Sequence, residues 1–180
     1  MEYKIIDSID KKILDDLISV SDRYYTHKYC TKIQGIDEAL RQRISFHSNR
    51  LCMLSLADNH PAMEKTITKV NFEISDKLNR LKNVVSGKGK KGAQKLEGKS
   101  IVCYVETNDG EKYPVYSCLK GKLLEINNFL IEKPDLIQTH PVSNGYIALL
   151  LPDLKYYAEA KECMLDEAEY LKICNETSAQ

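Results

Sequence analysis

The chain has 180 residues, of which 43% are hydrophobic and 29% charged. That apolar content is enough for one buried core, which excludes a wholly disordered chain. Its 26 basic and 26 acidic residues give a formal net charge of zero, so the bulk charge disfavours a nucleic-acid-binding protein and leaves only a local basic patch for that role.

Six cysteines, at positions 30, 52, 103, 118, 163 and 174, form no C-x-x-C pair, and most lie in apolar runs such as Leu51-Cys52-Met53. The first residues lack the apolar stretch of a secretory signal. No segment approaches the roughly 20 apolar residues that cross a bilayer. We therefore expect buried free thiols in a soluble intracellular protein without a membrane-spanning segment.

Residues 2–21 have the spacing of an amphipathic helix, whose apolar side carries Ile6, Ile9, Ile13, Leu17 and Val20. Such a helix either folds back on its own domain or docks in the groove of a partner. We favour the first of these two interpretations.

From residue 43 the pattern changes to short strands separated by turns. The runs 44–47 and 51–56 flank the turn-like Ser48-Asn49-Arg50 and predict a hairpin. Residues 67–74 alternate apolar and polar. Asn108-Asp109-Gly110 is a strong hairpin signal, since these residues tolerate positive φ. Further strands are expected at 101–106, 113–117, 122–127 and 145–151.

Short strands with frequent turns favour a β-sandwich or barrel over a parallel α/β sheet. Pro134 and Pro141 bracket a connection too irregular for a central strand. Residues 154–174 have helical periodicity, and a loose tail is expected from Asn175. The predicted apolar face comprises Leu51, Met53, Leu54, Val70, Phe72, Ile101, Cys103, Val115, Leu124, Ile126, Ile147 and Leu149.

Residues 84–99 contain half of the eight glycines of the chain and must form a loop or a series of tight turns. This segment and its flank carry six lysines, of which five precede the first acid at Glu97: Lys82, Lys88, Lys90, Lys91, Lys95 and, beyond Glu97, Lys99. Such a cationic loop attracts an acidic protein surface or a nucleic-acid backbone, or it simply keeps the chain soluble. Lys88, Lys90, Lys91 and Lys95 are the candidate partner-binding residues.

Catalytic and metal-binding patterns are absent from the sequence. His27, His47, His60 and His140 lack metal-ligand spacing, and we expect all four to be structural or surface residues. His60-Pro61 and His140-Pro141 lie in turns, where we expect the His ring to be exposed. There is no G-x-S-x-G elbow. Gly87 to Gly92 has the spacing of a phosphate loop, but Ala and Gln follow where Lys and Ser or Thr are required. We expect no enzyme activity, no metal and no cofactor.

Several of these segments together resemble the Abitram (Simiate) family. The likeness covers roughly residues 22–155 and rests on motifs at 22–25, 47–52, 60–61, 85–88, 92–94, 109–111, 121–127, 145–148 and 151–152, among them His47-Ser48-Asn49-Arg50 and Gly121-Lys122-Leu123-Leu124-Glu125-Ile126-Asn127.

The resemblance implies a mainly β (α+β overall) barrel-sandwich hybrid fold, similar to the glycine-cleavage H-protein and the biotinyl/lipoyl carrier domains. We expect an N-terminal helix and linker at 1–42, this domain at 43–152, and a C-terminal helix and tail at 153–180. It also implies binding of G- and F-actin and regulation of actin polymerisation, filopodia and neurite or dendrite branching. The implied locations are nuclear speckles, with a transcription-modulating role, and the cytoplasm, including lamellipodia and growth cones.

Kinship with carrier domains leaves an alternative, in which a lysine at a hairpin tip carries a lipoyl or biotinyl group. In this chain the predicted tip is 108–111, and the nearest lysine, Lys112, lies beyond it at the start of a strand. Since a swinging arm needs its lysine at the apex, we favour a non-catalytic interaction protein over a carrier. A nuclear module binding RNA or DNA through the Lys-Gly loop is the third hypothesis.

Overall fold

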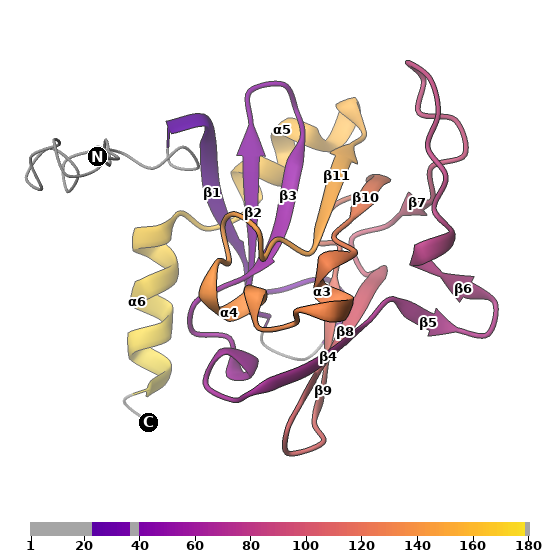
Figure 1. Ribbon diagram of the computed structural model, residues 1–180. Helices are drawn as coiled ribbons and strands as arrows, with labels where there is room; N and C mark the ends of the chain where they lie inside the picture. Colours follow the sequence, from indigo (N-terminus) through magenta and orange to yellow (C-terminus); the bar gives the residue numbers. More distant parts are fainter. Residues whose placement is uncertain (1–22, 37–39, 179–180) are drawn as a thin grey trace, which may run out of the picture.

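The computed structural model describes residues 23–36 and 40–178, so the predicted helix at 2–21 lies outside the described residues. Two main antiparallel sheets and a small two-stranded ribbon make up the body, with helices at its periphery (Figure 1). The mainly β architecture expected from the sequence is confirmed.

The larger sheet has six strands, and each pair of neighbours is antiparallel. Its β2–β3 hairpin turns through Arg50, which has φ of 72°, and this is the hairpin predicted at 44–56. In spatial order the strands are β1 (Tyr25–Cys30), β2 (Gln42–His47), β3 (Cys52–Leu56), β11 (Ala148–Pro152), β10 (Gly121–Ile126) and β7 (Lys95–Leu96).

The predicted domain boundary at residue 43 leaves out strand β1, although β1 pairs along its whole length with β2. This strand was not predicted, because an edge strand is half exposed and its residue pattern is therefore largely polar. The β-sheet structure therefore begins at Tyr25.

The second sheet has the order β4 (Ile67–Asn71), β8 (Ile101–Thr107) and β9 (Lys112–Tyr116). The alternating run predicted at 67–74 is divided at the buried Phe72, after which β5 (Glu73–Ser75) pairs with β6 (Leu78–Asn79) in the separate ribbon. The Asn71 side chain accepts a hydrogen bond from the Glu73 amide at 2.9 Å and stabilises this change of direction.

One large apolar cluster lies between the two main sheets. Of the predicted core residues, Met53, Leu54, Val70, Phe72, Cys103, Val115, Ile126 and Ile147 are buried, whereas Leu51, Ile101, Leu124 and Leu149 are only partly buried. The β10–β11 register shifts between Leu123 and Glu125. An irregularity of this kind breaks strict alternation, so Leu123 rather than Leu124 is fully buried beside Ile126.

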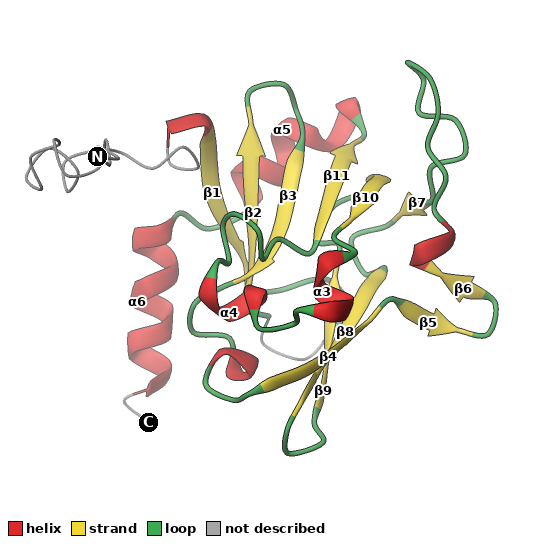
Figure 2. Cartoon of the chain, in the orientation of Figure 1, coloured by secondary structure: helices red, strands yellow, loops and turns green. Residues whose placement is uncertain are grey.

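Short helices fill the connection between β10 and β11, and two longer helices follow β11 (Figure 2). The short ones are α3 (Phe129–Glu132) and α4 (Leu136–Thr139), with 3-10 turns η2 (Pro61–Met63) and η3 (Arg80–Lys82) elsewhere. The prediction of one helix at 154–174 is wrong in its continuity: α5 (Leu154–Cys163) and α6 (Glu167–Ser178) are separated.

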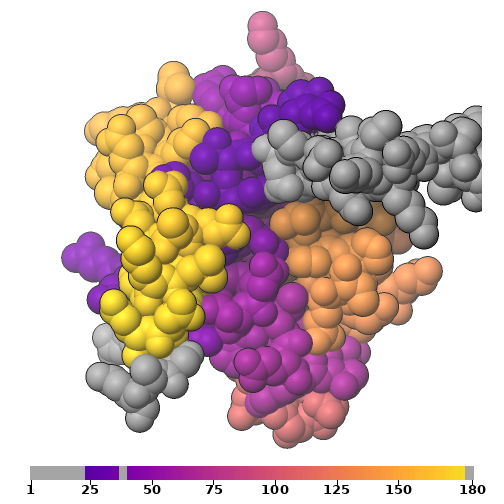
Figure 3. All heavy atoms as spheres, turned by 90° about the vertical axis from the view of Figure 1, so that its left-hand side faces the viewer, coloured from indigo at the N-terminus to yellow at the C-terminus, as the bar shows by residue number. Residues whose placement is uncertain are grey.

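The break between α5 and α6 falls at Met164, which is extended and buried. Leu165 forms an isolated bridge with Tyr29 of β1, and the Tyr29 ring stacks on Tyr170 of α6 at 4.3 Å. This contact places α6 along the β1 side of the molecule (Figure 3). The loose tail predicted from Asn175 is also wrong, because α6 continues to Ser178.

Candidate functional site

Residues 84–92 form a projecting turn, here called the lysine ribbon, between η3 and β7 (Figure 1). Ser86 and Lys91 exchange backbone hydrogen bonds of 3.0 and 2.9 Å, and the Lys90 amide donates to the Gly87 carbonyl at 3.1 Å. Gly87 and Lys90 adopt φ values of 65° and 51°. The series of tight turns predicted for this segment is confirmed.

The lysine ribbon presents uncompensated positive charge. Lys88 and Lys91 are exposed and Lys90 is half-exposed. In the part of the chain that the structure describes, none of these three lysines forms an ion pair. The negative charges of an approaching acidic surface would offset the repulsion among the three lysines. Charge complementarity therefore favours binding of such a surface.

Lys95 does not lie on the lysine ribbon but at its base, on β7. There it is paired in register with Lys122 of β10, whose ammonium group donates to the Gly89 carbonyl at 2.9 Å. The structure thus brings together three of the four lysines proposed from the sequence and places the fourth in an edge strand of the larger sheet. Lys122, which anchors the ribbon from β10, was not recognised from the sequence.

A buried arginine holds the base of the lysine ribbon. Arg80 is 3% exposed and donates to the Ile101 carbonyl at 2.7 and 3.1 Å and to the Gln94 side chain at 2.8 Å. Asn83 accepts from the Gln94 amide at 2.8 Å and donates to the Leu123 carbonyl at 3.0 Å. Both ends of the ribbon are therefore bonded to the sheets.

Glycine at position 92 is required by a close approach at the neck of the ribbon. A Cβ atom there would lie 2.4 Å from the Val84 carbonyl oxygen, and φ is 82°. Three large apolar side chains are exposed beside this neck: Leu78 at 36%, Leu81 at 43% and Val84 at 70%. Sequence reasoning missed them, because nothing in their spacing distinguishes an exposed apolar residue from a buried one.

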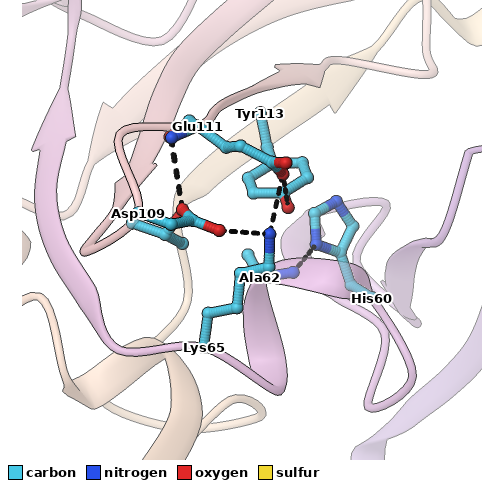
Figure 4. A network of polar contacts seen from close by, with 7 residues as sticks. His60, Ala62, Lys65, Asp109, Glu111 and Tyr113 are labelled. Atoms are coloured by element: carbon cyan, nitrogen blue, oxygen red, sulfur yellow. Dashed lines mark hydrogen bonds and ion pairs between the residues drawn. The ribbon is translucent and has the colours of Figure 1, made fainter.

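The tip of the β8–β9 hairpin holds a separate polar network (Figure 4). Lys65 Nζ lies 2.5 Å from Asp109 Oδ2 and 2.8 Å from Glu111 Oε2, and the Tyr113 hydroxyl donates to the same Glu111 oxygen. The hydrogen bond from Lys65 lowers the pKa of the Asp109 carboxyl to about 2. The His60 ring packs edge-on against Tyr113, with centroids 5.3 Å apart.

The apex of this hairpin carries a carboxylate and no lysine. The turn residues are Asn108, Asp109 and Gly110, and Gly110 has φ of 83°. Lys112 lies in β9, and its ammonium group is 3.1 Å from Glu106 Oε1. The Lys112 side chain is exposed, but it emerges from a paired strand and not from the apex.

The expectation that His60 is exposed in a turn is wrong. Its ring is buried, and Nδ1 accepts a hydrogen bond from the Ala62 amide at 3.1 Å, capping η2. Burial lowers its pKa to about 4. Among the described residues no group of three or more His, Cys, Asp or Glu side chains is arranged to hold a metal ion.

The cysteines are all free thiols, but they are not uniformly buried. Cys30, Cys52 and Cys103 are buried, Cys118 and Cys174 are intermediate, and Cys163 is exposed. No helix in the described part of the chain has the length and apolar character needed to span a bilayer.

The profile of the family "Glycine cleavage H-protein" matches residues 63–177. The crystal structure of a glycine cleavage system H protein from Mycobacterium marinum superposes with a TM-score of 0.54 at 14% identity, covering 75% of this chain and 91% of that one. The fold is therefore a barrel-sandwich hybrid of the H-protein type.

Closer relatives carry the name Protein Abitram. That of Xenopus tropicalis is 39% identical over 160 residues, which cover 86% of this chain and 85% of the relative. The human protein is 38% identical with 86% coverage of both chains. The relative from Dictyostelium discoideum is 34% identical, covering 86% of this chain and 87% of its own. The chain belongs to the Abitram family.

Proposed function

We propose that this protein is a non-catalytic, actin-binding regulator and that the lysine ribbon is the surface that contacts actin. The single observation that carries the proposed site is a cluster of three lysines, without ion pairs to any described residue, on a turn bonded to the body at both ends. Membership of the Abitram family supports the choice of actin, whose surface is acidic.

Pre-organisation supports binding by this segment. Because Arg80, Asn83 and Gln94 already fix the neck of the ribbon, little backbone entropy remains to be lost when a partner binds. Leu81 and Val84, exposed beside the lysines, supply apolar area to the same contact. An interface with an apolar centre and a polar rim is typical of transient protein–protein contacts.

The test is co-sedimentation with actin filaments, together with pyrene-actin polymerisation. Reversal of the ribbon charge in a Lys88→Glu, Lys90→Glu, Lys91→Glu variant should reduce affinity at least tenfold, and wild-type binding should weaken between low and physiological salt. The matched control changes the net charge by the same amount at exposed positions elsewhere, with the substitutions Lys133→Glu, Lys155→Glu and Lys172→Glu. This control variant should bind actin as the wild type does. Equal binding by the two reversal variants would remove the ribbon as the site, and no binding by the wild type would remove actin as the partner.

The carrier alternative is favoured by the H-protein fold and opposed by the hairpin apex. Lys112 would have to leave its ion pair with Glu106 and would still emerge from β9. Intact-mass measurement of protein purified from its native tissue tests this alternative directly. A lipoyl or biotinyl adduct on Lys112 would establish it, and an unmodified mass would exclude it.

Nucleic acid is the third candidate for the same lysines, and it makes a different prediction about salt. If the ribbon contacted phosphates, the logarithm of the affinity would fall steeply and linearly with the logarithm of the salt concentration.

We propose that the protein acts in nuclear speckles and in the cytoplasm, including actin-rich projections, through protein contacts. Immunofluorescence of the ribbon reversal variant tests whether this localisation depends on the lysines.

A further inference from the structure

A cavity of about 350 Å³ outside the lysine ribbon is lined by three cysteines. It lies where the end of β1, the connection from β9 to β10 and the end of α5 meet. Cys30 is the last residue of β1, Cys118 belongs to the connection, and Cys163 is the last residue of α5. Three segments far apart in the sequence thus direct thiols to one place.

Two of these thiols lie close together. Cys30 and Cys118 both line the cavity, and Cys30 is paired in register with Gln42, the residue that the Cys118 side chain contacts. Cys118 Sγ also lies 2.9 Å from the side-chain oxygen of the buried Gln42 and donates to it. Cys118 has φ of 57°, a conformation that non-glycine residues seldom adopt, and this backbone turns its side chain towards β1 and β2.

The two neighbouring thiols are chemically unequal. The nearby Cys118 side chain lowers the pKa of the Cys30 thiol. Burial raises the pKa of the Cys118 thiol well above its usual value, and Gln42 accepts its proton in a hydrogen bond. Cys30 is therefore the better nucleophile, and Cys118 is a protonated neighbour within reach of it.

We propose that Cys30 and Cys118 are an oxidation site for a small peroxide and that the product is a disulfide between them. The Cys30 thiolate attacks one oxygen of hydrogen peroxide, the O–O bond breaks, and the leaving hydroxide takes up a proton to become water. The Cys118 sulfur then attacks the sulfur of the resulting sulfenic acid. Its hydroxyl leaves with the Cys118 proton as a second water, so two thiols are oxidised while one peroxide is reduced.

The size of the oxidant follows from the burial of Cys30. Because Cys30 is only 5% exposed, a bulky oxidant such as a tripeptide disulfide does not reach its sulfur atom. The cavity does admit a molecule as small as a peroxide. The other thiols provide internal comparisons. Burial raises the pKa of Cys52 to about 12 and that of Cys103 still further, so both should resist oxidation.

The product would change the mechanics of the sheet. β1 is an edge strand that pairs with β2 alone among the described strands. A covalent bond from its last residue to the β9–β10 connection would tie this edge to the other side of the core, and the two sulfur atoms must close to about 2.05 Å to form it. Fraying of an edge strand allows its amide hydrogens to exchange with solvent. Amide hydrogen exchange in β1 should therefore be slower in the oxidised protein than in the reduced protein.

The experiment treats the fully reduced chain with hydrogen peroxide, alkylates the remaining thiols, and maps the peptides by mass spectrometry. We expect a linked pair of peptides containing Cys30 and Cys118, the loss of two alkylatable thiols out of six, and recovery of both with dithiothreitol. In Cys118→Ser the sulfenic acid at Cys30 should persist and be trapped by dimedone, while in Cys30→Ser residue 118 should remain alkylatable.

Cys163→Ser is the matched control, since it removes the exposed thiol beside the same cavity and should leave the disulfide yield unchanged. The proposal is overturned if peroxide modifies Cys163 or Cys174 while Cys30 and Cys118 both remain alkylatable in the wild-type chain. It is equally overturned if Cys30 pairs with Cys163. The wild-type map decides the question even where a serine variant fails to fold.

Discussion

Replacement of the buried His60 should remove a defined part of the acid sensitivity of this fold. His60 is 7% exposed, and burial is the main cause that lowers its pKa from about 6.5 to about 4, with a smaller contribution from the positive charge of Arg41. Its Nδ1 caps η2 through the Ala62 amide, so the neutral ring is the form that the native structure uses.

The sign of the effect follows from which state binds the proton first. Above pH 6.5 the ring is neutral in both states and its contribution to stability is fully present. As the pH falls from 6.5 to 4, the unfolded chain is protonated while the native chain is not, so the free energy of unfolding decreases. With about 1.4 kcal/mol for each pH unit, the loss is about 2 kcal/mol at pH 5 and about 3 kcal/mol at pH 4.

His60→Asn is the decisive variant, because asparagine can still accept the Ala62 amide proton but does not titrate. Urea unfolding of both proteins at pH 7.5 and pH 5 measures the difference. The wild type should lose about 2 kcal/mol more than the variant between these two values. Equal losses would refute the reasoning, since every other titrating group is common to the two proteins.

Three further predictions concern packing and hydrogen bonds. Arg80→Met should lower the free energy of unfolding by about 3 kcal/mol in urea, because the Ile101 carbonyl and Gln94 lose charged donors; a loss below about 1 kcal/mol would show that water replaces them. Gly121→Ala should cost more than about 2 kcal/mol in thermal unfolding, since the new Cβ would lie 2.3 Å from a carbonyl oxygen of β11, and an unchanged midpoint would contradict the close approach. Tyr170→Ala should raise amide exchange throughout α6 by removing the ring stacked on Tyr29, while protection of the β10–β11 pair stays the same.

Local signals in the sequence predicted the turns well and the faces of strands less well. The Asn-Asp-Gly hairpin and the β2–β3 hairpin are where the residue chemistry placed them, because positive φ is a property of one residue and its neighbours. Strict alternation predicted the buried face of β10, and this prediction missed Leu123. The reason is that the shift in register between β10 and β11 depends on a strand distant in sequence.

The candidate site shows the same division. The accumulation of lysine and glycine at 84–99 was visible as composition, and it predicted a cationic turn. That Lys95 stands apart from Lys88, Lys90 and Lys91, and that Arg80 holds the ribbon at its base, depended on pairing with β10 and contact with β8. No local pattern reports which carbonyl a buried arginine will meet.

The sequence by itself therefore determined the class of fold, the turns, the family and the cationic character of the ribbon, because composition, dihedral preference and motif order are carried by the residues themselves. Only the tertiary structure decided that β1 joins the sheet, that His60 is buried, and that Cys30 and Cys118 line one cavity. Each of these depends on which distant segments are brought together when the core closes, and that is a property of the whole chain.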